Sequence, residues 1–307
     1  MFAVRRILGS QLTPVSRCLG SVIASLILLN GCRRDTFEPD QSARTAGPGR
    51  PVFSSSTASG YVLISQPDSM GPQAVSFGRS LLCPAGKRIL GGGVQNANYG
   101  VVIQESAPNA SGDTWAYTVS RDTAGTSVGF TGWAVCADSG LSGYGLISQP
   151  DSMGPQTLSF GRGLLCPFRR RVLGGGVQNA NYGVVVQETY PKSSGDTWAY
   201  TVSRKTGGTT VTFTGRAICA DSTITGYVLV SRPDSMLPQA LSFGRSLLCP
   251  SGKRVFSGGV QNANYGVVVQ ESHPNSAGDT WAYTVSRKTG GSTVRFTGWA
   301  ACATATS

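Results

Sequence analysis

Short stretches in which apolar and polar residues alternate with a period of two recur through the chain from residue 60 to its end. In the segment "TWAYTVSR" (residues 114–121) this alternation predicts a half-buried β-strand whose Trp115, Tyr117 and Val119 face the core. No stretch after residue 32 has the 3.6-residue period of an amphipathic helix. We therefore expect an all-β protein. The abundance of glycine, 41 of 307 residues, favours many turns.

Six strands are predicted in the segment of residues 60–142. They cover residues 61–66, 74–83, 87–95, 101–106, 114–121 and 127–137. Pro67 is expected to end the first strand, and the glycine triplet of the third suggests a bulge or close packing of backbones. Six strands joined by short turns indicate a small antiparallel sandwich or barrel.

The last predicted strand has two different faces. Val128, Phe130 and Cys136 lie on one face by alternation, and we expect that face to be buried. The other face varies widely between copies of the segment, at Gly129, Thr212 and Arg295 and again at Trp133, Arg216 and Trp299. A position that accepts glycine, threonine or arginine is expected to face water. The same reasoning predicts exposed tryptophans at residues 133 and 299.

The segment occurs three times with a period of 83 residues. The copies begin at Gly60, Gly143 and Gly226 with "GYVLISQPDSMGPQ", "GYGLISQPDSMGPQ" and "GYVLVSRPDSMLPQ". We therefore predict a signal peptide (residues 1–31), a tether (32–59) and β-repeats over 60–142, 143–225 and 226–307. Because near-identity runs through the whole unit, shared residues reflect common descent as readily as function.

Six cysteines follow the repeat frame, two in each copy. Cys83 and Cys136 are 53 residues apart, as are Cys166 and Cys219, and Cys249 and Cys302. One pair per repeat in an exported chain predicts one disulfide per repeat. A zinc site is the alternative, but CxxC spacing is lacking and His273 is the only histidine, so we expect no metal.

The first 32 residues have the pattern of an export signal. Residues 1–17 contain three arginines and no acid, and residues 18–31 form an apolar stretch too short to span a bilayer comfortably. The stretch ends in Leu29-Asn30-Gly31-Cys32, which resembles the lipobox of bacterial lipoproteins. That resemblance implies that Cys32 is lipidated and that the protein hangs from the membrane by lipid alone. The alternative is an ordinary cleaved secretory signal, with Cys32 incidental.

Residues 33–59 are rich in Pro, Gly, Ser, Thr and charged residues and are predicted to be a disordered tether. Arg33, directly after Cys32, favours the outer membrane if the cell has one. The net charge is +11, and loss of the three arginines of the signal peptide leaves +8. A basic surface favours anionic partners such as acidic polysaccharide, lipopolysaccharide phosphates or nucleic acid, or it serves solubility only. Because the basic residues form no cluster, nucleic acid is not an expected partner.

The repeat itself carries two resemblances. The pattern "LLCPAGKRILGGGV…GWAVCA" (residues 81–94 and 132–137) resembles a Cys-Pro-x-Gly repeat of secreted bacterial proteins. Its cysteine–proline opening is also similar to that of the vitelline membrane outer layer proteins. This second resemblance implies an alternative architecture, in which three repeats form one β-prism-like unit around a pseudo-threefold axis.

Candidate catalytic groups are few. Each repeat contains carboxylates equivalent to Asp68, Glu105 and Asp113, and the first two also have one equivalent to Asp138. Paired carboxylates can hydrolyse glycosidic bonds when they share a cleft, but nothing in the sequence brings these together. With one histidine in the chain, no Ser-His-Asp or Cys-His arrangement repeats. We therefore expect a protein that is not an enzyme and needs no cofactor.

The loop "NANYG" is the first candidate ligand site. Proteins bind sugars through planar amides and carboxylates, with an aromatic ring stacking on the C–H face of the sugar. The candidate residues are Asn96, Asn98, Tyr99 and Arg79, then Asn179, Asn181, Tyr182 and Arg162, then Asn262, Asn264, Tyr265 and Arg245. In the alternative interpretation, asparagine and glycine are there because they tolerate a tight turn, and the tyrosine covers the edge of the core.

The sequence is consistent with three functions, of which two are favoured. The first is a lipid-anchored cell-surface or periplasmic protein that binds glycan or matrix ligands, anionic ones among them, through three repeated β-domains. The second is a structural envelope protein whose repeats act as spacers. A polysaccharide-active enzyme is a third, less favoured alternative.

Overall fold

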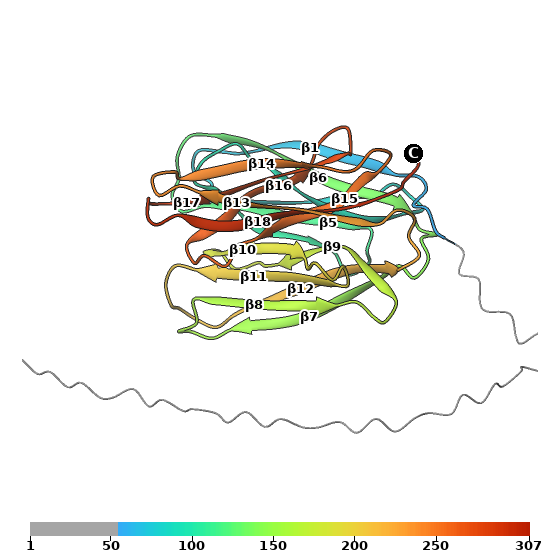
Figure 1. Cartoon of the computed structure of the whole chain (residues 1–307). Coiled ribbons are helices and arrows are strands. Elements are labelled where there is room, and N and C mark those ends of the chain that lie inside the picture. Colours follow the sequence, from blue (N-terminus) through green and yellow to red (C-terminus); the bar gives the residue numbers. More distant parts are fainter. Residues whose placement is uncertain (1–54) are drawn as a thin grey trace, which may run out of the picture. The chain divides into compact units, whose positions relative to one another are not determined.

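The structure, a computed structural model, describes residues 55–307, which form one compact unit built entirely from β-strands and turns. Figure 1 shows the strands running roughly side by side across the molecule. Within these residues no helix is long and apolar enough to cross a membrane. The predicted signal peptide, the lipobox with Cys32 and most of the predicted tether lie outside the described residues.

Each repeat contributes six strands, and the bounds are nearly the same in all three. The first repeat has β1 (Val62–Met70), β2 (Ser76–Leu82), β3 (Lys87–Gln95), β4 (Val101–Pro108), β5 (Thr114–Arg121) and β6 (Val128–Asp138). The second has β7 (Gly145–Met153), β8 (Ser159–Leu165), β9 (Arg170–Gln178), β10 (Val184–Pro191), β11 (Thr197–Arg204) and β12 (Val211–Asp221). The third has β13 (Val228–Met236), β14 (Ser242–Leu248), β15 (Arg254–Gln261), β16 (Val267–Pro274), β17 (Thr280–Arg287) and β18 (Val294–Ala303).

These strands form three six-stranded sheets, and every sheet is shared between two repeats. The orders are β1-β6-β3-β16-β17-β14, β2-β5-β4-β9-β12-β7 and β13-β18-β15-β10-β11-β8. Repeat 1 therefore joins repeat 3 in one sheet and repeat 2 in another, while repeats 2 and 3 share the last. The all-β class and the three repeats are confirmed. The shared sheets join the three repeats into one closed unit, which is the alternative to three separate sandwiches.

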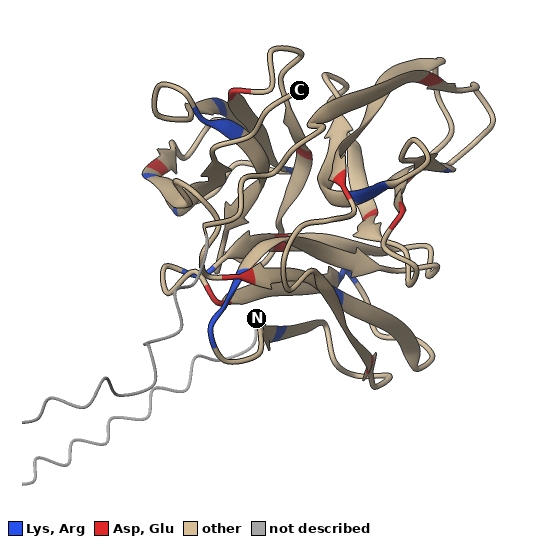
Figure 2. Ribbon diagram, turned by 90° about the vertical axis from the view of Figure 1, so that its right-hand side faces the viewer, with Lys and Arg blue, Asp and Glu red and all other residues tan. Residues whose placement is uncertain are grey.

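The six-stranded sandwich is still visible inside each repeat. Its strands β1-β6-β3 lie in one sheet and β2-β5-β4 in the next, and the two halves pack face to face. Between them Phe130 meets Phe77 and Tyr117 edge-on, at ring-centroid distances of 5.3 and 6.4 Å. Trp115, Tyr117 and Val119 are buried, as the alternation predicted. Figure 2 shows these two-layered groups of strands diverging from a common centre.

The sheets meet where the third and fourth strands of neighbouring repeats pair. Each junction is a single paired position: Ser106 with Val177, Thr189 with Val260, and Ser272 with Val94. The third strands β3, β9 and β15 also contact one another, so they surround the centre of the molecule. So short a ladder lets each sheet bend sharply at the junction.

The glycine triplet of the third strand is explained by this centre. A Cβ on Gly91 would lie 2.2 Å from the carbonyl oxygen of Phe256 in the third repeat, and one on Gly93 would lie 1.7 Å from that of Ser272. A Cβ on Gly92 would meet the Trp115 ring at 2.6 Å. The triplet therefore permits close packing, one of the two roles that the sequence suggested. In the third repeat, Ser257 replaces the first glycine and its hydroxyl donates to the carbonyl of Leu173.

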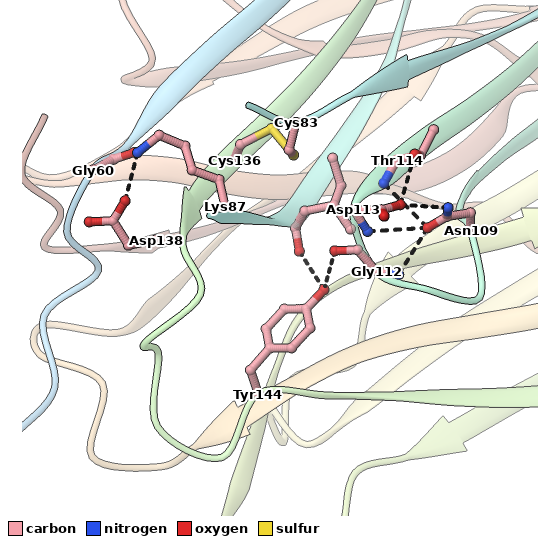
Figure 3. The surroundings of a disulfide bond; sticks show 11 residues. Gly60, Cys83, Lys87, Asn109, Gly112, Asp113, Thr114, Cys136, Asp138 and Tyr144 are labelled. Atoms are coloured by element: carbon pink, nitrogen blue, oxygen red, sulfur yellow. Dashed lines mark hydrogen bonds and ion pairs between the residues drawn. A yellow bond between two sulfur atoms is a disulfide. The ribbon is translucent and has the colours of Figure 1, made fainter. Parts of the chain in front are cut away.

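All three predicted disulfides are present: Cys83–Cys136, Cys166–Cys219 and Cys249–Cys302. In the first repeat, Cys83 follows β2 and Cys136 lies in β6, so the bond joins two different sheets. Figure 3 shows this bond near the Lys87–Asp138 ion pair. Each disulfide thus links the two layers of its own repeat.

Two details of the strand prediction are wrong. The first strand does not stop at Pro67 but continues to Met70, with Pro67 opposite Thr131. This is possible because β1 is the edge strand of its sheet, where a missing N–H breaks no ladder. Trp133 and Trp299 are buried rather than exposed, because the outward face of β6 and β18 packs against the neighbouring repeat. Gly129, Thr212 and Arg295 are exposed, as expected.

The chain before the first repeat also belongs to the fold. Ser56 pairs in parallel with Ile224, at the border of repeats 2 and 3, and Ala58 pairs with Ala305 near the C-terminus. These short pairings hold the N-terminal leader, residues 56–58, against the end of repeat 2 and the end of repeat 3.

Candidate functional site

The three asparagine–tyrosine loops connect neighbouring repeats. Asn96 is fully buried, and its Nδ2 donates to the carbonyl of Val101 at 2.8 Å and to that of Gln270, in repeat 3, at 3.4 Å. Its Oδ1 accepts hydrogen bonds from the backbone and the side chain of Asn98, both at 3.1 Å. Asn179 and Asn262 repeat this arrangement. These amides are engaged inside the protein, which corrects the expectation that they face a ligand.

The remaining loop residues also have partners within the protein. Asn98 donates through Nδ2 to the carbonyl of Gly129 at 2.6 Å. Tyr99 is 51 % exposed, yet its hydroxyl donates to the carbonyl of Arg287 in the third repeat at 2.7 Å. Equivalent bonds join Asn181 to Thr212, Asn264 to Arg295, Tyr182 to Arg121 and Tyr265 to Arg204. All three tyrosines remain exposed over about half of their surface.

A glutamine and a glutamate on the fourth strand complete each connection. Gln270 Nε2 donates to the Asn96 carbonyl at 3.0 Å, and Glu271 accepts the Asn96 backbone N–H at 3.1 Å. Equivalent glutamine bonds join Gln104 to Asn179 and Gln187 to Asn262. We call this set of contacts the inter-repeat clasp. The motif "GGVQNANYGVV" therefore has a structural role at every border between repeats.

Beside each clasp, the variable position of the sixth strand meets a variable position of the neighbouring fourth strand. Trp133 stacks on His273 with 6.2 Å between the ring centroids, and Trp299 stacks on Tyr190 with 6.3 Å between them. At the third border, Arg216 faces the smaller Ala107-Pro108 and donates to the Pro108 carbonyl at 2.7 Å. Partial burial lowers the pKa of Arg216, which Glu105 opposes. The residues differ between borders, but each pair fits its own neighbour.

The arginines of the candidate set lie elsewhere, on the second strand of each repeat. Arg79 forms an ion pair with Asp68 at 2.8 Å, and its guanidinium lies 5.9 Å from the Phe77 ring. The Tyr117 hydroxyl donates to the other oxygen of Asp68. Burial, and then Asp68, raise the pKa of Tyr117. The second and third repeats have the same group as Arg162–Asp151–Tyr200 and Arg245–Asp234–Tyr283.

In the second repeat this group borders a hollow that is wide open to solvent. Its volume is about 810 Å³, and residues of β7, β8, β9 and β12 line it. The lining includes Gln149, Asp151, Phe160, Arg162, Gln178 and Thr214. The Asp151 side chain is nearly buried, whereas that of Arg162 is 42 % exposed. The guanidinium is therefore the accessible part of an otherwise internal network, in a wall that also offers amide, hydroxyl and aromatic groups.

The Arg–Asp–Tyr group differs in charge among repeats. Arg232 stands in the third repeat where the others have Gln66 and Gln149, and its Nε lies 3.9 Å from Asp234. Asp234 thus faces two arginines, Arg232 and Arg245, whereas its equivalents face one. The third group therefore has an excess positive charge.

The candidate catalytic carboxylates have separate partners. Asp113 accepts hydrogen bonds from Asn109 and Thr114 (Figure 3) and from Ser111. The Ser111 bond contributes most to lowering the pKa of Asp113 to about 2. Asp138 pairs with Lys87 at 2.7 Å. Glu105 lies at the border with repeat 2, where burial raises its pKa. Hydrogen bonds within a turn, an ion pair and burial between two repeats thus explain the surroundings of these three carboxylates.

Within residues 55–307, no three His, Cys, Asp or Glu side chains gather as metal ligands would. Comparisons with protein-family models and with curated proteins find no match to this chain.

Proposed function

We propose that this protein is a lipid-anchored cell-envelope protein that binds glycans at the Arg–Asp–Tyr groups of its three repeats. The three disulfides fit an extracellular or periplasmic location. The hollow beside Arg162 is the observation that carries the proposal, because it combines amides, hydroxyls, an arginine and aromatic edges in one concave place. Polyhydroxylated ligands are recognised by this mixture of groups.

The threefold repetition supports multivalent recognition. The same arginine, aspartate and tyrosine recur in every repeat, so a polymer with repeating sugars meets three similar groups on one rigid body. Three weak sites gain about 10²–10⁴ in avidity when the geometry allows simultaneous binding. The outward halves of Tyr99, Tyr182 and Tyr265 offer a second surface for sugar rings.

Two triple variants test the arginine groups on a glycan array. Replacing Arg79, Arg162 and Arg245 by lysine keeps the charge but removes the fork of donors, and we expect glycan binding to fall at least tenfold. Replacing Tyr99, Tyr182 and Tyr265 by phenylalanine keeps the rings and serves as the matched control, with binding expected to persist. The proposal fails if the wild-type chain binds no glycan, or if the lysine variant binds as well while remaining folded.

A purely structural role is the second candidate. The inter-repeat clasps favour it, because they explain the repeated asparagine, tyrosine and glutamine side chains of the loops without a ligand. A spacer protein predicts no glycan affinity and a pull-down partner from the envelope. Binding lost in the lysine variant would argue against it.

A further inference from the structure

One turn of the second repeat differs from its two counterparts. Between β8 and β9 the chain reads Pro167-Phe168-Arg169, where the other repeats have Pro-Ala-Gly and Pro-Ser-Gly. Phe168 is 89 % exposed, and the Arg169 guanidinium lies 5.3 Å from its ring. Alanine and serine serve at this place in the sister repeats, so the fold itself does not require the large ring.

The backbone of this turn is strained. Arg169 has a φ of 63°, whereas Gly86 and Gly252 occupy the equivalent positions at 79° and 75°. Among residues 55–307 it is the one non-glycine residue with positive φ. A side chain in this region is unfavourable, and such strain persists where the residue has a role. Arg169 is therefore less favourable for stability than the glycine found at the same position in the other two repeats.

The turn lies beside the entry of the N-terminal leader. The Arg169 carbonyl accepts the N–H of Ser222 at 2.8 Å, and the next residue, Thr223, accepts the N–H of Ser56 at 3.1 Å. The leader continues from here into residues 1–54, which contain Cys32, the expected lipidation site. The turn is thus at the end of the fold from which the chain leads to its predicted anchor.

Further apolar and basic side chains lie at this strand end and at its equivalents in the other two repeats. Leu82, Leu165 and Leu248 close the second strands and are 66, 64 and 66 % exposed. Arg170 follows in the sequence; its side chain is 35 % exposed, and its Nε lies 3.8 Å from Asp221, which offsets part of its charge. An exposed aromatic ring and exposed leucines beside arginines suit the boundary between headgroups and acyl chains of an anionic membrane.

We propose that this end of the protein contacts the anionic lipid surface directly, with Phe168 entering the headgroup boundary and Arg169 and Arg170 facing the lipid phosphates. The proposal concerns a surface distinct from the Arg–Asp–Tyr groups and does not depend on glycan binding. The contact is additional to the lipid on Cys32 and orients the fold against the membrane.

Sedimentation with vesicles tests the contact. The mature chain from residue 32, carrying Cys32→Ser so that no acyl chain contributes, is mixed with vesicles of phosphatidylcholine alone or with a third of phosphatidylglycerol. We expect binding to the anionic vesicles only. Phe168→Ser, the residue of the third repeat, lowers that binding about tenfold, and Arg169→Gly, the residue of both sister repeats, about fivefold. Lys205→Gln, which removes one charge from the β11–β12 turn, leaves it unchanged.

Thermal unfolding separates this effect from damage to the fold. Arg169→Gly relieves the positive φ, so it raises the melting temperature while it weakens vesicle binding. Wild-type chain that does not bind anionic vesicles, or Phe168→Ser and Arg169→Gly variants that bind as well as the wild type, would overturn the proposal. An equal loss in Lys205→Gln would show nonspecific attraction and overturn it as well.

Discussion

The contact between Gly93 and the third repeat gives the sharpest test of the shared sheets. In Gly93→Ala, the added Cβ would lie 1.7 Å from the Ser272 carbonyl oxygen, about half the 3.4 Å of an ordinary contact. That oxygen belongs to backbone on a different repeat, at the single position where β3 and β16 pair. Neither strand can yield by rotating a side chain, so the two sheet halves must separate.

The expected cost follows from overpacking. Insertion of a methyl group into a packed interior costs about 1–3 kcal/mol, and a clash with backbone belongs at the upper end. At about 2–4 °C per kcal/mol for a domain of this size, the melting temperature falls by about 6–12 °C. Differential scanning fluorimetry at equal protein concentration measures the shift.

Gly71→Ala is the matched control, because a Cβ there meets nothing within 4 Å. Its melting temperature should stay within about 2 °C of the wild type, as for other surface substitutions. An unchanged melting temperature in Gly93→Ala would refute the reasoning, since independent sandwiches have no third-repeat backbone at this place.

Three more predictions concern the disulfides, the stacked histidine and the first tyrosine. Replacing Cys166 and Cys219 by serine opens a 53-residue loop and should lower the unfolding free energy in urea by about 4 kcal/mol; a loss below 1 kcal/mol would contradict it. Burial lowers the pKa of His273 in the folded protein, so on acidification the unfolded chain is protonated at this residue at a higher pH than the folded chain. The free energy of unfolding should therefore decline as the pH falls below about 6.5. His273→Tyr, which copies the Tyr190 border, should flatten this decline in melting temperature between pH 7.5 and 5; equal slopes would argue against it. Tyr61→Phe leaves the buried Val255 carbonyl without its 2.9 Å donor and should cost about 1–2 kcal/mol in the same urea assay, whereas no loss would show that this link between repeats 1 and 3 is dispensable.

Local pattern was sufficient for the strands but not for the pairing between repeats. Lys87–Gln95 and Thr114–Arg121 have the bounds that alternation and turn residues predicted. The pairing of β3 with β16 joins residues more than 170 positions apart, and nothing in either strand specifies its partner. The prediction that Trp133 faces water was wrong for the same reason. Trp133 stacks on His273, which belongs to another repeat and could not be identified from the local sequence.

For the candidate site, too, the sequence indicated local properties of the residues but not their contacts with other repeats. For arginine and tyrosine the residue type correctly indicated exposure, since Arg79 and Tyr99 are both partly exposed. Asn96 is interior because its amide replaces backbone partners that the turn and the neighbouring strand leave open. The variation of residue 129 correctly indicated a water-facing position, whereas that of residue 133 reflected three differently built borders.

Calorimetry of the intact chain tests most directly whether the three repeats are one closed unit. Shared sheets predict a single transition whose calorimetric enthalpy, about 180 kcal/mol for roughly 250 residues near 60 °C, equals the van't Hoff enthalpy. Separate transitions, or a van't Hoff enthalpy near a third of the calorimetric value, would show that the repeats unfold independently and would contradict the closed unit.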